Sequence, residues 1–245
     1  NGEPSGSAYN LNAPSTPIDL GAGRTAVEVA CGGEHTCVIL DNGDMKCWGK
    51  GEFGRNGNGE RSEDIGSPPS DTIDLGTNRT AIATCASSYA HSCAILDNGS
   101  LKCWGYNYYG QLGDGIGRGN NGGPGDEPID FGTGRTVVAV SCGQDHTCAI
   151  LDNNNVYCWG GLSGGSLGTT QNFHLTYTDE PLDLPPIDLG TGRTPVAITS
   201  FHKHSCVILD NGEMKCWGQN EKGQLGTGRS DVSWSVPESV SGSDT

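Results

Sequence analysis

The sequence predicts an all-β protein, a β-propeller-type array of four blade-like units of about 55 residues each. Three observations lead to this fold class. Two different phrases each recur four times along the chain. No long segment repeats its apolar residues with a period of 3.6, so we expect almost no helix. The 40 glycines, 12 prolines and 33% hydrophobic residues are typical of short strands joined by many turns.

The phrase PIDLGAGRT at residues 17–25 marks the start of each unit, and its copies begin at Thr72, Pro128 and Pro186. We place an N-terminal tail at 1–17, a four-repeat domain at 18–240 and a C-terminal tail at 241–245. Within the domain the units are 18–72, 73–128, 129–186 and 187–240. Each would hold about four strands: the IDLG segment, a strand such as 137–140, and a hairpin. This is the make-up of a propeller blade, in an incomplete or a four-bladed ring.

The hairpin is the second repeated phrase, HTCVILDNGDMKCWG at residues 35–49. Residues 41–43 suit a three-residue loop that ends at positive φ, which Gly43 adopts without steric cost. The third copy has Asn154 there, and asparagine tolerates this conformation better than most residues.

The loop fixes the register of the hairpin and places Cys37 opposite Cys47. Opposed residues in an antiparallel pair have Cα atoms about 4.5–5.5 Å apart, within the range that a disulfide needs. We therefore predict one cross-strand disulfide per unit. The alternative is a pair of buried thiols in a reduced protein. The four pairs are Cys37–Cys47, Cys93–Cys103, Cys148–Cys158 and Cys206–Cys216.

Eleven cysteines leave three outside the hairpins, Cys31, Cys85 and Cys142, as unpaired or intermolecular cysteines. At least one must be free or bonded to another chain, because eleven is odd. The paired cysteines favour an oxidising compartment, hence a secreted or cell-surface protein. C-x2-C spacing is absent, which argues against a zinc site. Asn78 and Asn98 lie in N-x-S/T triplets and would be glycosylation sites in such a protein.

One tryptophan and one histidine recur at fixed places in every unit. A residue at a fixed place in each blade is most simply explained by packing between blades, although tryptophans could instead form a ligand cage. For the histidines we expect a hydrogen bond to a blade turn. The tryptophans are Trp48, Trp104, Trp159 and Trp217, and the histidines are His35, His91, His146 and His204.

No catalytic constellation, cofactor motif or metal motif is recognisable, and we expect no enzyme activity. Asp114, Asp126 and Glu127 could bind calcium weakly, but they lack the spacing of a dedicated loop. The net charge of −15 repels phosphate backbones and anionic lipid, which disfavours nucleic acid and membrane surfaces as partners.

The phrases HTCAILDNG, KCWG and GQLG-x-G resemble the repeat of the regulator-of-chromosome-condensation family, in its cysteine-bearing extracellular form. The resemblance implies a toroid of four-stranded blades without catalytic activity, with seven blades in the well-known members. Those members include a nuclear exchange factor, a secreted β-lactamase inhibitor and a plant ultraviolet-B receptor, so function does not follow from fold. Unit 1 departs from the pattern, because Asn56 replaces the leucine found at 112, 167 and 225.

The two ends suggest self-assembly. Residues 237–245 align with 17–25 as the degraded start of a fifth unit, and an unpaired edge strand would invite pairing with another molecule. We therefore expect a non-enzymatic extracellular scaffold whose copies join head to tail into a filament or surface layer. One alternative is a secreted binding module or inhibitor that uses loops 114–127 and 169–185. The other is nucleotide exchange or chromatin association, which the acidic charge disfavours.

Overall fold

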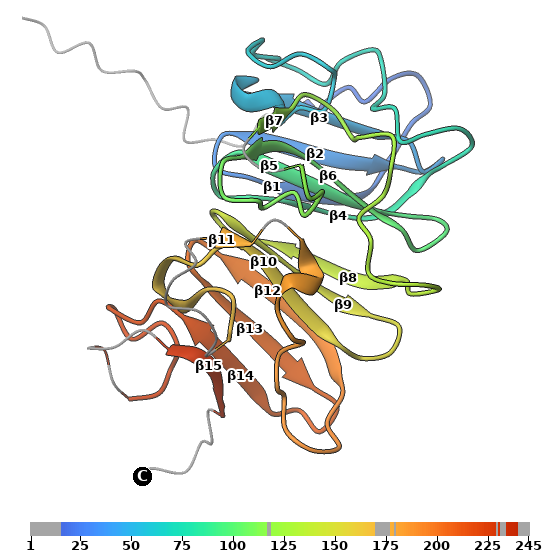
Figure 1. The fold of residues 1–245 in the computed structure, drawn as a ribbon. Coiled ribbons are helices and arrows are strands. Elements are labelled where there is room, and N and C mark those ends of the chain that lie inside the picture. The colour runs from blue at the N-terminus through green and yellow to red at the C-terminus, as the bar shows by residue number, and fades with distance from the viewer. Residues whose placement is uncertain are drawn as a thin grey trace, which may run out of the picture.

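The structure, a computed structural model, describes residues 16–116, 119–169, 177–178, 180–228, 230 and 234–239. They form four separate antiparallel sheets, one per unit (Figure 1). Blade 1 contains β1 (Ala26–Cys31), β2 (His35–Leu40) and β3 (Met45–Gly49). Blade 2 contains β4 (Ala81–Ala86), β5 (His91–Leu96), β6 (Leu101–Asn107) and β7 (Gly119–Asn121). Blade 3 contains β8 (Val137–Cys142), β9 (His146–Leu151), β10 (Val156–Gly161) and β11 (Tyr177–Thr178). Blade 4 contains β12 (Pro195–Phe201), β13 (His204–Leu209), β14 (Met214–Gly218) and β15 (Trp234–Ser239).

Helix is confined to three single 3₁₀ turns in the part of the chain that the structure describes, as the composition predicts. They are η1 (Glu52–Gly54), η2 (Ser163–Gly165) and η3 (Pro181–Asp183). The predicted hairpin register is present in blade 1, where Cys37 pairs with Cys47 and the Leu40 N–H bonds to the Asp44 carbonyl. Gly43 has a φ of 81°, and Asn154 adopts a φ of 67° at the same place in blade 3.

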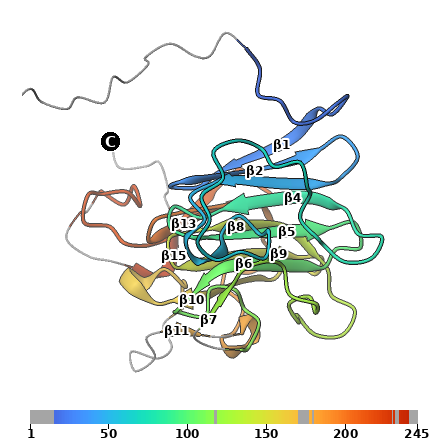
Figure 2. The ribbon, with the colours of Figure 1, turned by 90° about the horizontal axis from the view of Figure 1, so that it is seen from above.

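The sheets stack in chain order around an open arc (Figures 1 and 2), and the hydrophobic core lies between them rather than within them. Ile39 and Met45 of blade 1, for example, cluster with Ala94, Leu96 and Trp104 of blade 2. Corresponding clusters lie between blades 2 and 3 and between blades 3 and 4. Each blade therefore depends on its neighbours to bury its apolar faces.

Two predictions about strands were wrong. The IDLG segments are not strands; in unit 2 the Ile73 N–H bonds to the Met45 carbonyl and so ties one blade to the next. The fourth strand comes instead from the variable loop, as β7, β11 or β15. Blade 1 has three strands and a single bridge between Gly49 and Ile65. Residues 237–239 belong to β15, which pairs with β14, so they do not start a fifth unit. Of the predicted tails, 1–17 and 241–245, residues 1–15 and 241–245 lie outside the described residues.

Candidate functional site at the blade junctions

A histidine, a hydroxyl, a carbonyl and a tryptophan meet at the junction between blades 1 and 2. The His35 Nε2 lies 2.8 Å from the Ser92 hydroxyl of the next blade. That hydroxyl donates to the carbonyl of Arg55 in blade 1, and the Trp104 indole N–H donates to the same carbonyl at 3.1 Å. Because Ser92 donates its proton to the carbonyl, it accepts from His35, which is neutral and carries its proton on Nε2.

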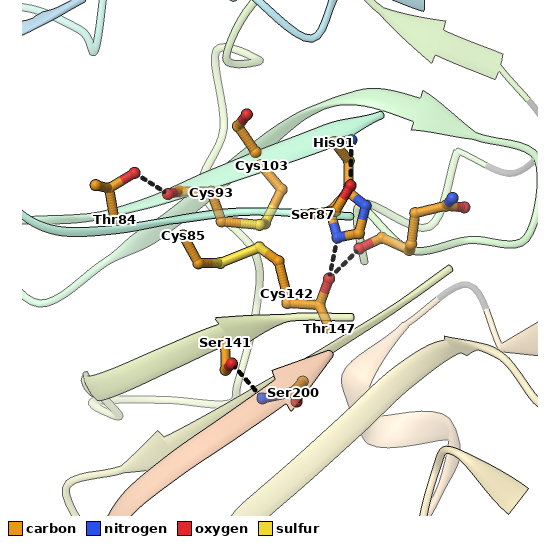
Figure 3. Close-up of a disulfide and its surroundings, with 12 residues drawn as sticks. Thr84, Cys85, Ser87, His91, Cys93, Cys103, Ser141, Cys142, Thr147 and Ser200 are labelled. Atoms are coloured by element: carbon orange, nitrogen blue, oxygen red, sulfur yellow. Dashed lines mark hydrogen bonds between the residues drawn. A yellow bond between two sulfur atoms is a disulfide. The ribbon is translucent and has the colours of Figure 1, made fainter. Parts of the chain in front are cut away.

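The same arrangement recurs along the chain. Between blades 2 and 3, His91 contacts the Thr147 hydroxyl, which donates to the Gln111 carbonyl (Figure 3). The Trp159 indole donates to the same carbonyl. Between blades 3 and 4, His146 contacts Ser205, and Trp217 donates to the Ser166 carbonyl. The histidines therefore bond to the next blade rather than to a turn, which corrects that prediction. The buried tryptophans pack between blades as predicted.

Burial keeps these histidines uncharged. Desolvation lowers the pKa of His35 to about 4 and that of His91 and His146 to about 3. The pKa of His204 in blade 4 is also lowered by desolvation, but its ring is only half-buried because no described residues form a following blade. A neutral imidazole has one N–H to donate, and each of these three histidines directs its Nε2 to a hydroxyl of the next blade.

The structure contains five disulfides. Four are the cross-strand hairpin pairs that the register predicts, each with Cα atoms 4.1 Å apart. The fifth joins Cys85 of blade 2 to Cys142 of blade 3, with Cα atoms 5.6 Å apart (Figure 3). The prediction that Cys85 and Cys142 are unpaired or intermolecular was therefore wrong.

Strand register explains why these two cysteines meet. Cys142 lies opposite Thr147, whereas Cys85 lies opposite Cys93, one place earlier in the repeat. A shift of one place turns a side chain to the other face of the sheet. Cys142 therefore faces back toward blade 2, and Cys85 faces forward toward blade 3. The offset was visible in the sequence, but its meaning depends on which blades are adjacent.

Cys31 remains as the free cysteine among the described residues, and it is exposed. The sulfur atoms of Cys85, Cys93 and Cys142 lie within 4.8 Å of one another, close enough to suggest a metal centre. All three are in disulfides, so they offer no thiolate to a metal.

The outer face of blade 4 is apolar, and no blade among the described residues covers it. Ile208 is 44% exposed and Met214 is 40% exposed. At the same two places in blades 1 to 3, the side chains are at most 2% exposed, because the following blade covers them. These buried equivalents are Ile39, Ile95, Ile150, Met45, Leu101 and Val156.

Blade 1 presents the opposite half of a junction. Ile18 is 59% exposed and Val29 is 61% exposed, whereas the equivalents of Ile18 in the other units, Ile73, Ile129 and Ile187, are buried. Trp48 is half-buried, unlike the three other repeat tryptophans, which are fully buried. Within the described residues, blade 1 thus lacks a preceding blade and blade 4 a following one.

The acidic residues considered for calcium do gather at one cavity of about 400 Å³, which Asp114, Asp126 and Glu127 line. Lys102 occupies the same cavity and donates to the carbonyls of Gly125 and Asp126. The Asp114 carboxylate accepts hydrogen bonds from Asn107 and from the backbone of Ile116. The Asp114 carboxylate is therefore already engaged in hydrogen bonds within the fold.

An aromatic cluster that the sequence did not single out lies beside the first two blades. It consists of Phe53, Tyr89, Tyr106, Tyr108 and Tyr109, with adjacent ring centroids 4.8–6.3 Å apart. Two of these tyrosines, Tyr89 and Tyr108, are exposed. Burial raises the pKa of Tyr106 to about 12, which keeps its hydroxyl protonated.

Both predicted glycosylation asparagines are exposed. Asn98 accepts hydrogen bonds from the backbone and hydroxyl of Ser100 within the hairpin turn, and Asn78 has a positive φ in the turn before β4. Much of loop 169–185 lies outside the described residues. Among those described, no helix is long and apolar enough to span a membrane.

Comparison with known proteins identifies the repeat. The family model described as "Regulator of chromosome condensation (RCC1) repeat" matches residues 26–59, 82–111, 137–163 and 202–224. The chain is 31% identical over 206 residues to the human E3 ubiquitin-protein ligase HERC2, covering 84% of this chain and 4% of that protein. It is 25% identical over 209 residues to the Arabidopsis thaliana ultraviolet-B receptor UVR8, covering 82% of this chain and 43% of the receptor.

Solved structures agree in fold. Prp20p from Saccharomyces cerevisiae matches with a TM-score of 0.76 at 18% identity, covering 92% of this chain and 52% of that one. Human WBSCR16 matches with a TM-score of 0.74 at 24% identity, covering 88% of this chain and 53% of that one. The chain thus spans about half the length of these propellers. It carries four RCC1 repeats and forms part of a propeller with five disulfides, which suggest an oxidising compartment.

Proposed function

We propose that this chain is a non-enzymatic, extracellular structural protein whose copies associate through the outer faces of blades 1 and 4. The observation that carries the proposal is the exposure of Ile208 and Met214 on blade 4, where their equivalents are buried by a following blade. Exposed apolar side chains grouped on one face are typical of a surface that binds a partner.

The two outer faces differ from each other, and this favours head-to-tail contact. A contact between unlike faces leaves one face of each type free on every pair, so further copies can add. Four blades correspond to about half of the solved propellers, by length. Two copies therefore supply eight blades, one more than the seven of the well-known members. If the blades stack at the angle found in a seven-bladed propeller, eight of them do not fit into one closed flat ring. This supports growth into a filament.

Extracellular placement rests on the disulfides, which persist in oxidising surroundings. The net charge of −15 opposes contact between copies at low ionic strength. Association is therefore expected to strengthen as salt screens this repulsion.

Sedimentation velocity over a range of protein concentrations, together with electron microscopy, tests the proposal. We expect concentration-dependent association and filaments in the images. Ile208→Asp should weaken association at least about tenfold, because it would bury a charge in the contact. Val196→Asp is the matched control: Val196 is exposed, and so are its equivalents in the covered blades, so it faces away from the junction. A chain that remains monomeric at high concentration would overturn the proposal.

A second candidate function is the binding of a different protein, and the exposed aromatic cluster favours it. Tyrosine is enriched at the centres of protein interfaces. Affinity capture of a stoichiometric foreign protein, lost in a Tyr89→Ala, Tyr108→Ala variant that still self-associates, would support this candidate.

A further inference from the structure

The direction in which the free Cys31 faces can be inferred from Cys142, which occupies the same place in another blade. Cys31 lies opposite Thr36 at the end of β1, and Cys142 lies opposite Thr147 at the end of β8. The two cysteines therefore occupy the same place in blades 1 and 3. The Cys142 side chain reaches back to the preceding blade, where it meets Cys85 (Figure 3). Cys31 faces the side of blade 1 on which a preceding blade would stand.

The place that Cys85 occupies in blade 2 belongs to Thr199 in blade 4. Cys85 lies opposite the first hairpin cysteine, Cys93, and Thr199 lies opposite Cys206. In blade 3 this place belongs to Ser141, whose hydroxyl accepts the backbone N–H of Ser200 in the next blade at 2.6 Å (Figure 3). Thr199 itself is exposed. In blades 2 and 3 the residue at this place therefore contacts the following blade.

We propose that blade 4 of one copy stacks on blade 1 of the next in the register of the internal junctions, so that Thr199 lies against Cys31. This inference rests on the proposed function and adds the pairing of faces and its register. Stacking in this register brings the His204 imidazole to the Thr36 hydroxyl. It also brings the Gln224 carbonyl, the equivalent of Gln111, to the Trp48 indole. All the groups of an internal junction are then present, half on each copy.

Contact between like faces lacks this complementarity. Blade 4 against blade 4 opposes two imidazoles and supplies no hydroxyl from the following blade. Blade 1 against blade 1 brings two Cys31 thiols together and predicts a disulfide-linked dimer of the natural chain. The head-to-tail register instead leaves Cys31 as a covered thiol opposite a threonine. The contact between copies is then held without a covalent bond, unlike the junction of blades 2 and 3.

A new cysteine tests the register directly. Thr199→Cys recreates the Cys85–Cys142 pair across the contact between copies. Under mild oxidation it should produce a ladder of multiples of the 25.5 kDa chain on a non-reducing gel. The additional change Cys31→Ser should abolish the ladder, and peptide mapping should show a bond between residues 31 and 199. Ser200→Cys is the matched control: it is the adjacent residue, its side chain faces blade 3, and it should give no ladder.

Three outcomes would overturn the inference, and sedimentation under reducing conditions distinguishes them. If the Thr199→Cys chain associates but forms no bond between residues 31 and 199, the register is wrong and the proposed function stands. If the natural chain forms only dimers linked through Cys31, like faces meet. If the natural chain stays monomeric, the proposed function fails and the inference fails with it. Alkylation of Cys31 in the natural chain provides a separate readout, and it should slow at least about tenfold on association, because the thiol becomes covered.

Discussion

Cys85 and Cys142 lie 57 positions apart in the sequence and are bonded to each other across the boundary between blades 2 and 3. The hairpin disulfides join positions only 10 apart, within a single blade. Among the five disulfides, the bond between Cys85 and Cys142 is therefore the one that joins two blades and limits how they move relative to each other.

Removing that link should cost more stability than removing a hairpin disulfide. In the chain-entropy model the longer loop contributes about 4 kcal/mol and the shorter loop about 3 kcal/mol. We expect Cys85→Ala with Cys142→Ala to lower the free energy of unfolding more than Cys37→Ala with Cys47→Ala. Guanidinium denaturation without reductant measures both. A larger loss in the hairpin variant would contradict the prediction.

The cysteine pairing also fixes a thiol count. Eleven cysteines with ten in disulfides leave one thiol per natural chain, on Cys31. Alkylation and intact mass measurement in denaturant should show one modified cysteine without reductant and eleven after reduction. Three modified cysteines without reductant would mean that Cys85 and Cys142 are not bonded.

The indole hydrogen bond can be tested with two tryptophans that occupy the same place in different blades. Trp104→Phe removes the bond to the Arg55 carbonyl and should destabilise the chain by about 1–2 kcal/mol. Trp48→Phe is the control, since Trp48 is only half-buried on the outer face of blade 1. It should leave unfolding nearly unchanged at low protein concentration and weaken self-association. Equal destabilisation by both changes would contradict the prediction that a repeat tryptophan stabilises the fold only where it is buried between two blades.

Acid should destabilise the fold through its buried histidines. Burial lowers the pKa of His35, His91 and His146 to about 3–4, whereas an unfolded chain takes up protons near pH 6.5. The unfolded state therefore binds more protons between these values. The contribution of these histidines to the free energy of unfolding is therefore fully present above about pH 6.5. It is lost as the pH falls toward 4, and the loss reaches about 2 kcal/mol per histidine at pH 5.

Thermal melting between pH 7 and pH 4.5 measures this loss. The variant His35→Gln removes one of the three titrating groups, so its melting temperature should fall less steeply with pH than that of the natural chain. A melting temperature that is the same at pH 7 and pH 5 would contradict the assignment of buried, neutral histidines.

Two hairpin glycines offer a matched pair. Gly43 and Gly212 have φ values of 81° and 82°, so alanine is strained at either position. A methyl group at Gly43 would also lie 2.5 Å from Thr80 of the next blade, whereas nothing lies within 4 Å of one at Gly212. We expect a loss of about 1 kcal/mol for Gly212→Ala and a clearly larger loss for Gly43→Ala, measured by chemical denaturation. An equal loss of unfolding free energy in both variants would show that the close approach of residue 43 to Thr80 does not affect stability.

The local structure of this protein can be predicted from its residues alone. Its repeats predict four sheets, and the loop at 41–43 predicts a register that places Cys37 opposite Cys47. Both features depend on residues close together in the chain, where turn geometry leaves few alternatives. The packing of Trp104 between blades follows from its recurrence, since one copy per blade indicates a repeated contact.

The contacts between the blades, in contrast, depend on how the sheets stack on one another. The pairing of Cys85 with Cys142 and the hydroxyl partner of His91 depend on which face of one sheet meets which face of the next. Spacing within a unit carries no information about that. The short outer strand β7 was missed for a related reason: its segment has no alternating apolar pattern and pairs through backbone hydrogen bonds. The uncovered Ile208 is identical in type to the buried Ile150, and only their positions in the array distinguish them.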